Sequence, residues 1–82
     1  MKKHKRMQIV ADNVKKYREK RGWTQEQLAE RAEVSHAFVN QIENCKRDMT
    51  LGYCHQICNA LNITPNDLLV SESEKEDSQK QV

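Results

Sequence analysis

The chain has 82 residues, of which 37% are hydrophobic and 32% are charged, and its formal net charge is +2. This length holds one small domain, and a content of two glycines and one proline argues against a turn-rich all-β fold. No apolar run approaches the roughly 20 residues of a membrane span, and the basic first residues lack the apolar segment of a secretory signal. Three cysteines cannot form a complete set of intrachain disulfides, so we expect a cytoplasmic protein with free thiols.

The charges divide the chain into three parts. Residues 1–8 hold four basic side chains and no acidic ones, residues 9–70 hold eight of each sign, and residues 71–82 hold four acidic and two basic ones. We expect a flexible basic arm, a compact domain and a disordered acidic tail, because the two ends are poor in apolar residues. The arm is either a solvated terminus or a segment that lies along a phosphate backbone.

The first predicted helix covers residues 9–21. Val10 and Val14 recur at helical spacing and belong to its apolar face. Arg18 lies at the edge of that face, where an arginine either extends to solvent or pairs with a buried acid. Gly22 is placed to end the helix in a left-handed conformation.

A second, short helix is predicted to begin after Thr24. Thr24 and Gln27 have the spacing of a capping box, in which each side chain bonds to the backbone N–H of the other residue. Trp23 before the cap and Leu28 after it are positioned as a hydrophobic staple. Glu33 then falls where the chain must turn sharply.

The third predicted helix begins after Ser35 and has two different faces. Phe38, Val39 and Ile42 can point inward, whereas the outward positions are polar but uncharged. An ordinary solvated face would carry Lys and Glu, while uncharged amides are typical of a surface that reads base edges. Gln41, for example, could pair with N6 and N7 of adenine. The outward residues are His36, Ala37, Asn40, Gln41 and Asn44.

Two further helices are predicted, over residues 51–61 and from Pro65 onward. Cys54 and Cys58 lie on the apolar stripe of the first of these. We interpret both thiols as core side chains rather than metal ligands or redox groups, because His55 is rotated away from them. Cys45 is expected to be exposed. The last helix should contribute Leu68, Leu69 and Val70 to the apolar surface.

This pattern resembles the lambda-repressor and Cro-type helix-turn-helix proteins, the XRE-like regulators of bacteria and phages, over about residues 10–69. The resemblance implies a compact all-α domain of five helices, with the helix-turn-helix as helices two and three. The residues that carry it are Val14, Tyr17, Arg18, Gly22, Trp23, Thr24, Gln25, Leu28, Ala29, Val34, Ser35, Val39, Ile42, Glu43, Asn44, Leu51, Ile57, Ala60, Leu61, Asp67, Leu68 and Leu69.

The resemblance also implies roles for particular residues. An arginine near the end of helix one and a glutamate near the end of helix three form an ion pair in such proteins, and here these are Arg18 and Glu43. Base contacts are implied for His36, Ala37, Asn40 and Gln41. Phosphate contacts are implied for Gln25, Ser35, Asn44, Lys46 and Arg47.

The chain departs from the family pattern at three positions. Glu33 and Cys45 stand where such proteins often have glycine, and Met49 stands where they often have proline. A positive φ at Glu33 would cost about 1 kcal/mol relative to glycine. These changes affect stability and loop shape more than the fold.

We therefore expect a sequence-specific regulator that binds a double-stranded DNA operator through the major groove, acts as a repressor and forms a homodimer, with Leu69 and Val70 in the interface. The alternative is an antitoxin or adaptor with the same fold, whose acidic tail binds a protein partner. No enzymatic motif is present, and we expect no cofactor, no metal and no membrane partner.

Overall fold

The computed structural model describes the backbone of residues 2–71 and the side chains of residues 5–71, so the predicted acidic tail lies outside the described residues apart from Ser71. The described part contains five helices and no strand, which confirms the predicted all-α fold. Their bounds are α1 Lys2–Lys20, α2 Gln25–Ala32, α3 His36–Glu43, α4 Leu51–Leu61 and α5 Pro65–Leu69. None of them combines the length and apolar character that are needed to cross a bilayer.

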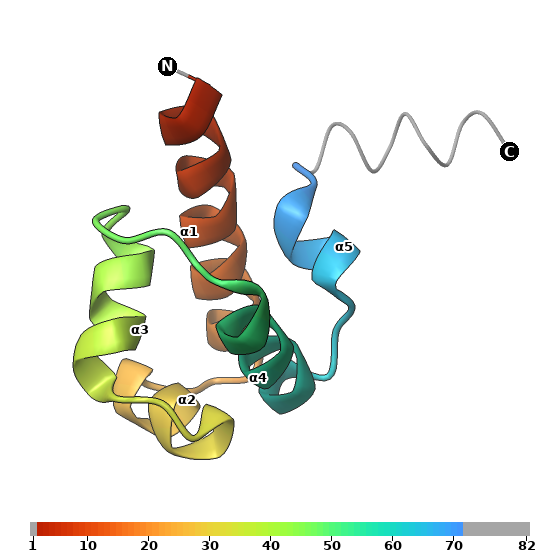
Figure 1. The fold of residues 1–82 in the computed structure, drawn as a ribbon. Helices are drawn as coiled ribbons and strands as arrows, with labels where there is room; N and C mark the ends of the chain where they lie inside the picture. Colours follow the sequence, from red (N-terminus) through yellow and green to blue (C-terminus); the bar gives the residue numbers. More distant parts are fainter. Residues whose placement is uncertain (1, 72–82) are drawn as a thin grey trace, which may run out of the picture.

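The long helix α1 is the axis of the domain (Figure 1). α3 packs on one side of α1 and α5 on the other, while α2 contacts both α3 and α4. Short helices such as α2 and α3 are not stable alone in water, because the free energy gained by about two turns of helix is smaller than the free-energy cost of nucleation. Their stability therefore comes from the shared core.

The start of α1 differs from the prediction. The helix begins at Lys2 rather than at residue 9, so residues 2–8 extend α1 and are not an arm that leaves the domain. The segment lacks an apolar stripe and a capping residue, which are the signals that a sequence pattern uses. It is nevertheless rich in Lys, Arg, Met and Gln, which all favour helix. Gln8 donates a hydrogen bond of 2.8 Å to Asp12, and Arg6 forms an ion pair with Asp48.

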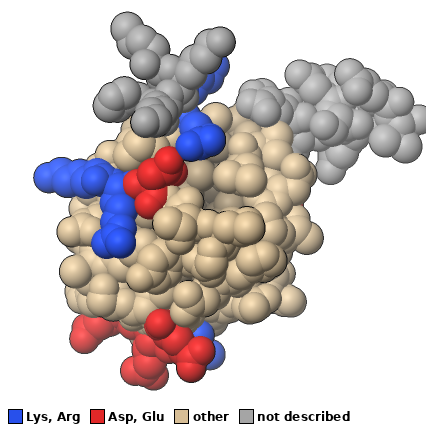
Figure 2. Space-filling model, in the orientation of Figure 1, with Lys and Arg blue, Asp and Glu red and all other residues tan. Residues whose placement is uncertain are grey.

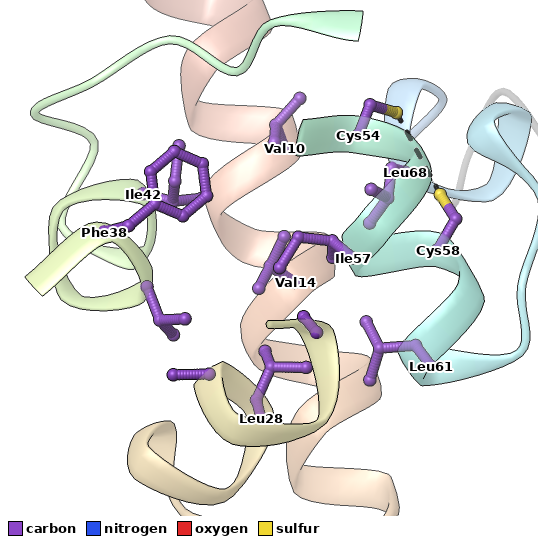
Figure 3. Packing of buried hydrophobic residues seen from close by; sticks show 13 residues of the cluster. Val10, Val14, Leu28, Phe38, Ile42, Cys54, Ile57, Cys58, Leu61 and Leu68 are labelled. Carbon is purple, nitrogen blue, oxygen red and sulfur yellow. Dashed lines mark hydrogen bonds between the residues drawn. The ribbon is translucent and has the colours of Figure 1, made fainter. Parts of the chain in front are cut away.

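The core is one cluster of aliphatic side chains, Phe38 and two thiols, contributed by all five helices (Figure 3). Val14, Leu28, Val39, Leu61 and Leu68 have no measurable exposure. Burying side chains of this size contributes about 1.5–3 kcal/mol each. Most of the predicted inward residues of the first four helices belong to this cluster. Tyr17 only packs against it, and Leu51, predicted on the apolar stripe of α4, is instead 74% exposed at the first position of that helix.

Cys54 and Cys58 lie within this cluster, as predicted, with their sulfur atoms 4.0 Å apart (Figure 3). Burial, and then the neighbouring Cys54, raise the pKa of the Cys58 thiol to about 12. Since metal ligation and oxidation proceed through the thiolate, this environment favours packing over either chemistry. Among residues 5–71, no group of three or more His, Cys, Asp or Glu side chains is placed to hold a metal ion. Cys45 is half-buried rather than exposed.

Four helices end in the same left-handed closure. One residue just past the end of each helix has a positive φ, and these residues are Gly22, Glu33, Cys45 and Asn62. In each closure two backbone N–H groups bond back to carbonyls of the last turn, which is the Schellman arrangement. Gly22 and Asn62 are residue types that tolerate this conformation, whereas Glu33 and Cys45 are strained there. Both strained closures flank α3.

Asn13 is the one buried polar residue in the described part of the chain that the sequence pattern missed. Its side-chain nitrogen donates to the carbonyl oxygens of Leu68, at 2.8 Å, and Val70, at 3.0 Å. α5 has only five residues, so these bonds and the burial of Leu68 hold it against α1. An amide between two apolar positions of a helix is the only sequence signal for this clamp.

Candidate nucleic-acid interface

The outward surface of α3 forms a continuous polar face, which we call the reading face. Ser35 begins the helix, with its hydroxyl accepting a hydrogen bond of 3.0 Å from the N–H of Phe38. This cap and the buried inner side chains fix the rotation of α3 about its axis. The side chains of the reading face are exposed, and they are those of His36, Ala37, Asn40, Gln41 and Asn44.

Gln25, the first residue of α2, fixes the orientation of two side chains on the reading face. Its Nε2 donates to Glu43 Oε1 at 3.1 Å, and a carboxylate can only accept, so Gln25 Oε1 must point the other way. That oxygen accepts from Asn40 Nδ2 at 3.1 Å and lies 3.3 Å from His36 Nε2. A hydrogen bond between these two atoms requires the proton to lie on Nε2 of His36, in which case Nδ1 is the acceptor of the neutral ring.

The predicted ion pair lies beneath this network. Arg18 donates to both carboxylate oxygens of Glu43, at 2.6 and 3.0 Å, and to the carbonyl of Trp23 at 2.6 Å. The side chains are only 12% and 3% exposed. The hydrogen bond to Glu43 raises the pKa of Arg18 further, so the guanidinium stays charged. α1, α2 and α3 are thus joined by charge-assisted bonds directly below the reading face.

The residues predicted to contact phosphates lie on or around the reading face, but they differ in how far their side chains are held by other contacts. Asn44 donates a hydrogen bond of 2.9 Å to the carbonyl of Asn40. Lys46 is exposed in the loop after α3. Arg47 is exposed too, yet its guanidinium lies over the Phe38 ring rather than extending from the loop. Gln25 and Ser35 are engaged in the network and the cap described above.

Charge is distributed unevenly around this site. Figure 2 shows Lys and Arg over the loop after α3 and the beginning of α1, with an acidic group among them, and a larger gathering of Asp and Glu at the opposite end, over α2. The acidic side belongs to the exposed residues Glu26, Glu30 and Glu33. A polyanion is therefore attracted toward the C-terminal end of α3 and repelled from the outer side of α2.

The structure places the residues predicted for the site on or around one surface, but their connections were not predicted. The bonds of Gln25 to Glu43 and Asn40, and the stacking of Arg47 on Phe38, join residues that are far apart in the chain. No spacing rule predicts such contacts. An uncharged reading face on the second of two short helices, with a tight turn between them, defines a DNA-binding helix-turn-helix protein.

Comparison with known proteins agrees with this class. The helix-turn-helix family profile matches residues 14–68, so the chain belongs to that family, of the XRE type, whose members are DNA-binding transcription regulators. The chain is 32% identical over 68 residues to the control protein C.SmaI of Serratia marcescens, covering 83% of this chain and 81% of that protein.

Solved structures show the same fold at lower identity. A hypothetical transcription factor, NHTF from Neisseria, superposes with a TM-score of 0.84 at 23% identity, over 89% of this chain and 84% of that one. The restriction-modification controller protein C.AhdI of Aeromonas hydrophila superposes with a TM-score of 0.73 at 24% identity, over 76% of this chain and 94% of that one.

Proposed function

We propose that this protein is a sequence-specific repressor that places α3 in the major groove of a double-stranded DNA operator. The observation that carries the proposal is the exposed, uncharged reading face, which is held from below by Gln25 and the Arg18–Glu43 pair. A face whose side chains are fixed before binding loses less conformational entropy when it meets the bases. Base contacts then come from His36, Ala37, Asn40 and Gln41, and phosphate contacts from Gln25, Ser35, Asn44 and Lys46.

Selection from randomised DNA duplexes is the direct test. The wild-type protein should enrich one motif, and Gln41→Ala should relax its preference at one base pair by roughly 1–3 kcal/mol. Lys46→Ala should weaken binding to all sequences alike and reduce the slope of affinity against salt by about one. Lys15→Ala is the matched control, because Lys15 is also an exposed lysine but lies on α1. Enrichment of no motif would overturn the proposal.

We also propose a homodimer through the surface beside α5. A groove of about 270 Å³ lies between the start of α1, the loop before α4 and α5. Leu51 and Leu69 line it and are 74% and 49% exposed, the two large apolar side chains in the described residues that are left in water. A second copy would cover both leucines, and a dimer would read two half-sites about 34–36 Å apart.

The dimer proposal is tested by sedimentation velocity over a concentration series. Leu51→Ser and Leu69→Ser should each shift the association to higher concentration, while His55→Ser, an exposed residue on α4, should not. A symmetric motif in the selection experiment would support the same conclusion. A wild-type protein that stays monomeric both free and on its motif would exclude the dimer.

The sign of regulation follows from where the operator lies. A promoter that carries the selected motif should be less active when the protein is present, since the bound protein excludes polymerase. Rising reporter activity would show activation instead and would refute the repressor assignment.

The similarity to C.SmaI favours a narrower role as a second proposal. That relative is a control protein, and it matches most of this chain at 32% identity. Two proteins of similar fold are restriction-modification controllers, so on this proposal the operator lies at a promoter of restriction-modification genes. A selected motif that occurs at no promoter of such genes in the source genome would reject this role without affecting DNA binding.

A further inference from the structure

Arg47 is held against two aromatic rings at the end of the reading face. Its guanidinium carbon lies 4.9 Å from the centre of the Phe38 ring and 5.8 Å from that of the Tyr53 ring. The two rings have centroids 4.3 Å apart and are tilted by 30°. Cation–π contact with both rings restricts a side chain that would otherwise sample many rotamers.

The closure after α3 brings Arg47 to this position. Cys45 has a φ of 59°, and its N–H bonds to the carbonyl of Ile42 at 3.1 Å. The N–H of Lys46 bonds to the carbonyl of Gln41 at 2.9 Å. The chain is thereby reversed at the end of the helix, so that Arg47 returns alongside a residue of the reading face.

That residue is Gln41. The Arg47 nitrogen NH1 donates to Gln41 Oε1 at 3.4 Å, a long contact between two exposed groups. With its oxygen facing the guanidinium, the Gln41 amide presents its NH₂ group outward. Bidentate pairing with adenine requires both the oxygen and the nitrogen of the amide, whereas guanine offers only the acceptors O6 and N7 at its major-groove edge. The Arg47 contact occupies one lone pair of the Gln41 oxygen, and the pair can offer the two acceptors of guanine one donor each, from the Gln41 NH₂ group and from the guanidinium.

We propose that Arg47 is a specificity-determining residue, and that the Gln41–Arg47 pair selects guanine rather than adenine at one operator position. The inference rests on the proposed reading of the major groove by α3. It replaces two expectations from the sequence, namely that Gln41 pairs with adenine and that Arg47 contacts a phosphate. Phe38 and Tyr53 act on the base indirectly and are positioning residues.

The test is selection from randomised duplexes with wild-type protein, Arg47→Ala and Arg47→Lys, followed by affinity measurements on the two duplexes that differ at the selected position. Wild type should prefer guanine about tenfold or more. Arg47→Ala frees the Gln41 oxygen and should shift the preference at that position toward adenine. Arg47→Lys should not retain the preference for guanine, because lysine lacks the planar guanidinium group that donates two hydrogen bonds and stacks on aromatic rings.

Four control variants separate this proposal from its rivals. Lys46→Ala, at the neighbouring basic residue, should leave the preferred base unchanged. Tyr53→Leu should lower the guanine preference, and Tyr53→Phe, which keeps the ring, should retain it. Circular dichroism of each variant establishes that the helices are intact, and Gln41→Ala provides a second loss of guanine preference without altering the stack.

The outcomes are distinguishable from a failure of the proposed function. If Arg47→Ala keeps the wild-type motif and loses affinity uniformly, with a salt slope lower by about one, Arg47 contacts a phosphate and the inference is wrong. A wild-type motif with adenine at the position affected by Gln41→Ala also overturns it. If wild type enriches no motif, it is the proposed sequence-specific function that fails.

Discussion

Two ion pairs that involve described residues of α1 connect the same kinds of groups in opposite surroundings. Arg18 and Glu43 lie 2.6 Å apart with side chains 12% and 3% exposed, while Arg6 and Asp48 lie 3.0 Å apart with side chains 58% and 46% exposed. From distance alone, the two pairs would be expected to contribute almost equally to stability. Burial separates them, because water screens the exposed pair and leaves the buried pair few alternative partners.

The surroundings also give the two pairs different roles. The carboxylate of Glu43 accepts from Gln25 as well as from Arg18, so the buried pair is continuous with the network that orients Asn40 and His36. Asp48, on the exposed side, accepts from Arg6 and from the N–H of Met49 in the loop before α4. The buried pair therefore supports the reading face, and the exposed pair closes one rim of the groove beside α5.

The largest expected effect comes from breaking the buried pair. Glu43→Ala leaves Arg18 charged and buried without its partner, and the free energy of unfolding should fall by about 3–5 kcal/mol in urea denaturation. The double variant Arg18→Met with Glu43→Leu removes both charges, so it should regain much of that stability. If the single variant loses less than about 1 kcal/mol, the pair behaves as a surface pair and the comparison fails.

A smaller effect is expected from relieving backbone strain beside α3. Glu33 has a φ of 60°, and Glu33→Gly should raise the free energy of unfolding by about 1 kcal/mol, because glycine adopts this conformation without a clash. Glu30→Gly, in the interior of α2, is the matched control and should lower it by a similar amount. If both substitutions lower the free energy of unfolding equally, the backbone at Glu33 is not strained. If Glu33→Gly raises the free energy of unfolding, backbone strain at Glu33 opposes part of the stability that the Arg18–Glu43 pair contributes.

The smallest effect is expected at the exposed pair. Asp48→Asn should change the free energy of unfolding by less than about 1 kcal/mol at low salt, and the difference should shrink further at high ionic strength. Arg6→Gln should behave the same way, and the double variant should equal either single one if the pair is the only interaction lost. A loss as large as that of Glu43→Ala would contradict the assignment of burial as the deciding factor.

The sequence predicted what depends on local chemistry. The capping box of Thr24 and the left-handed Gly22 follow from short-range rules, and the structure shows both. Each signal lies within a few residues of its effect, so spacing alone suffices. The family resemblance added Arg18 and Glu43, which no local rule joins.

What could not be predicted depends on tertiary position. Asn13 resembles any polar residue in a helix until Leu68 and Val70 present their carbonyls to it. Arg47 resembles any basic loop residue until the reversed chain places it over Phe38. The uncapped start of α1 at Lys2 was missed for the opposite reason, because helix propensity acts there without any stripe or cap to reveal it.

The clamp made by Asn13 has a consequence for motion. α5 has only five residues and lies at the edge of the core, where Asn13 and the buried Leu68 help to fasten it to α1, so it should open more readily than the longer helices. The same opening would displace Leu69, which lines the groove proposed for a second copy. Association and closure of α5 would then be one linked equilibrium. Amide hydrogen exchange in Pro65–Leu69 would become slower as protein concentration rises, while exchange in α2 would not.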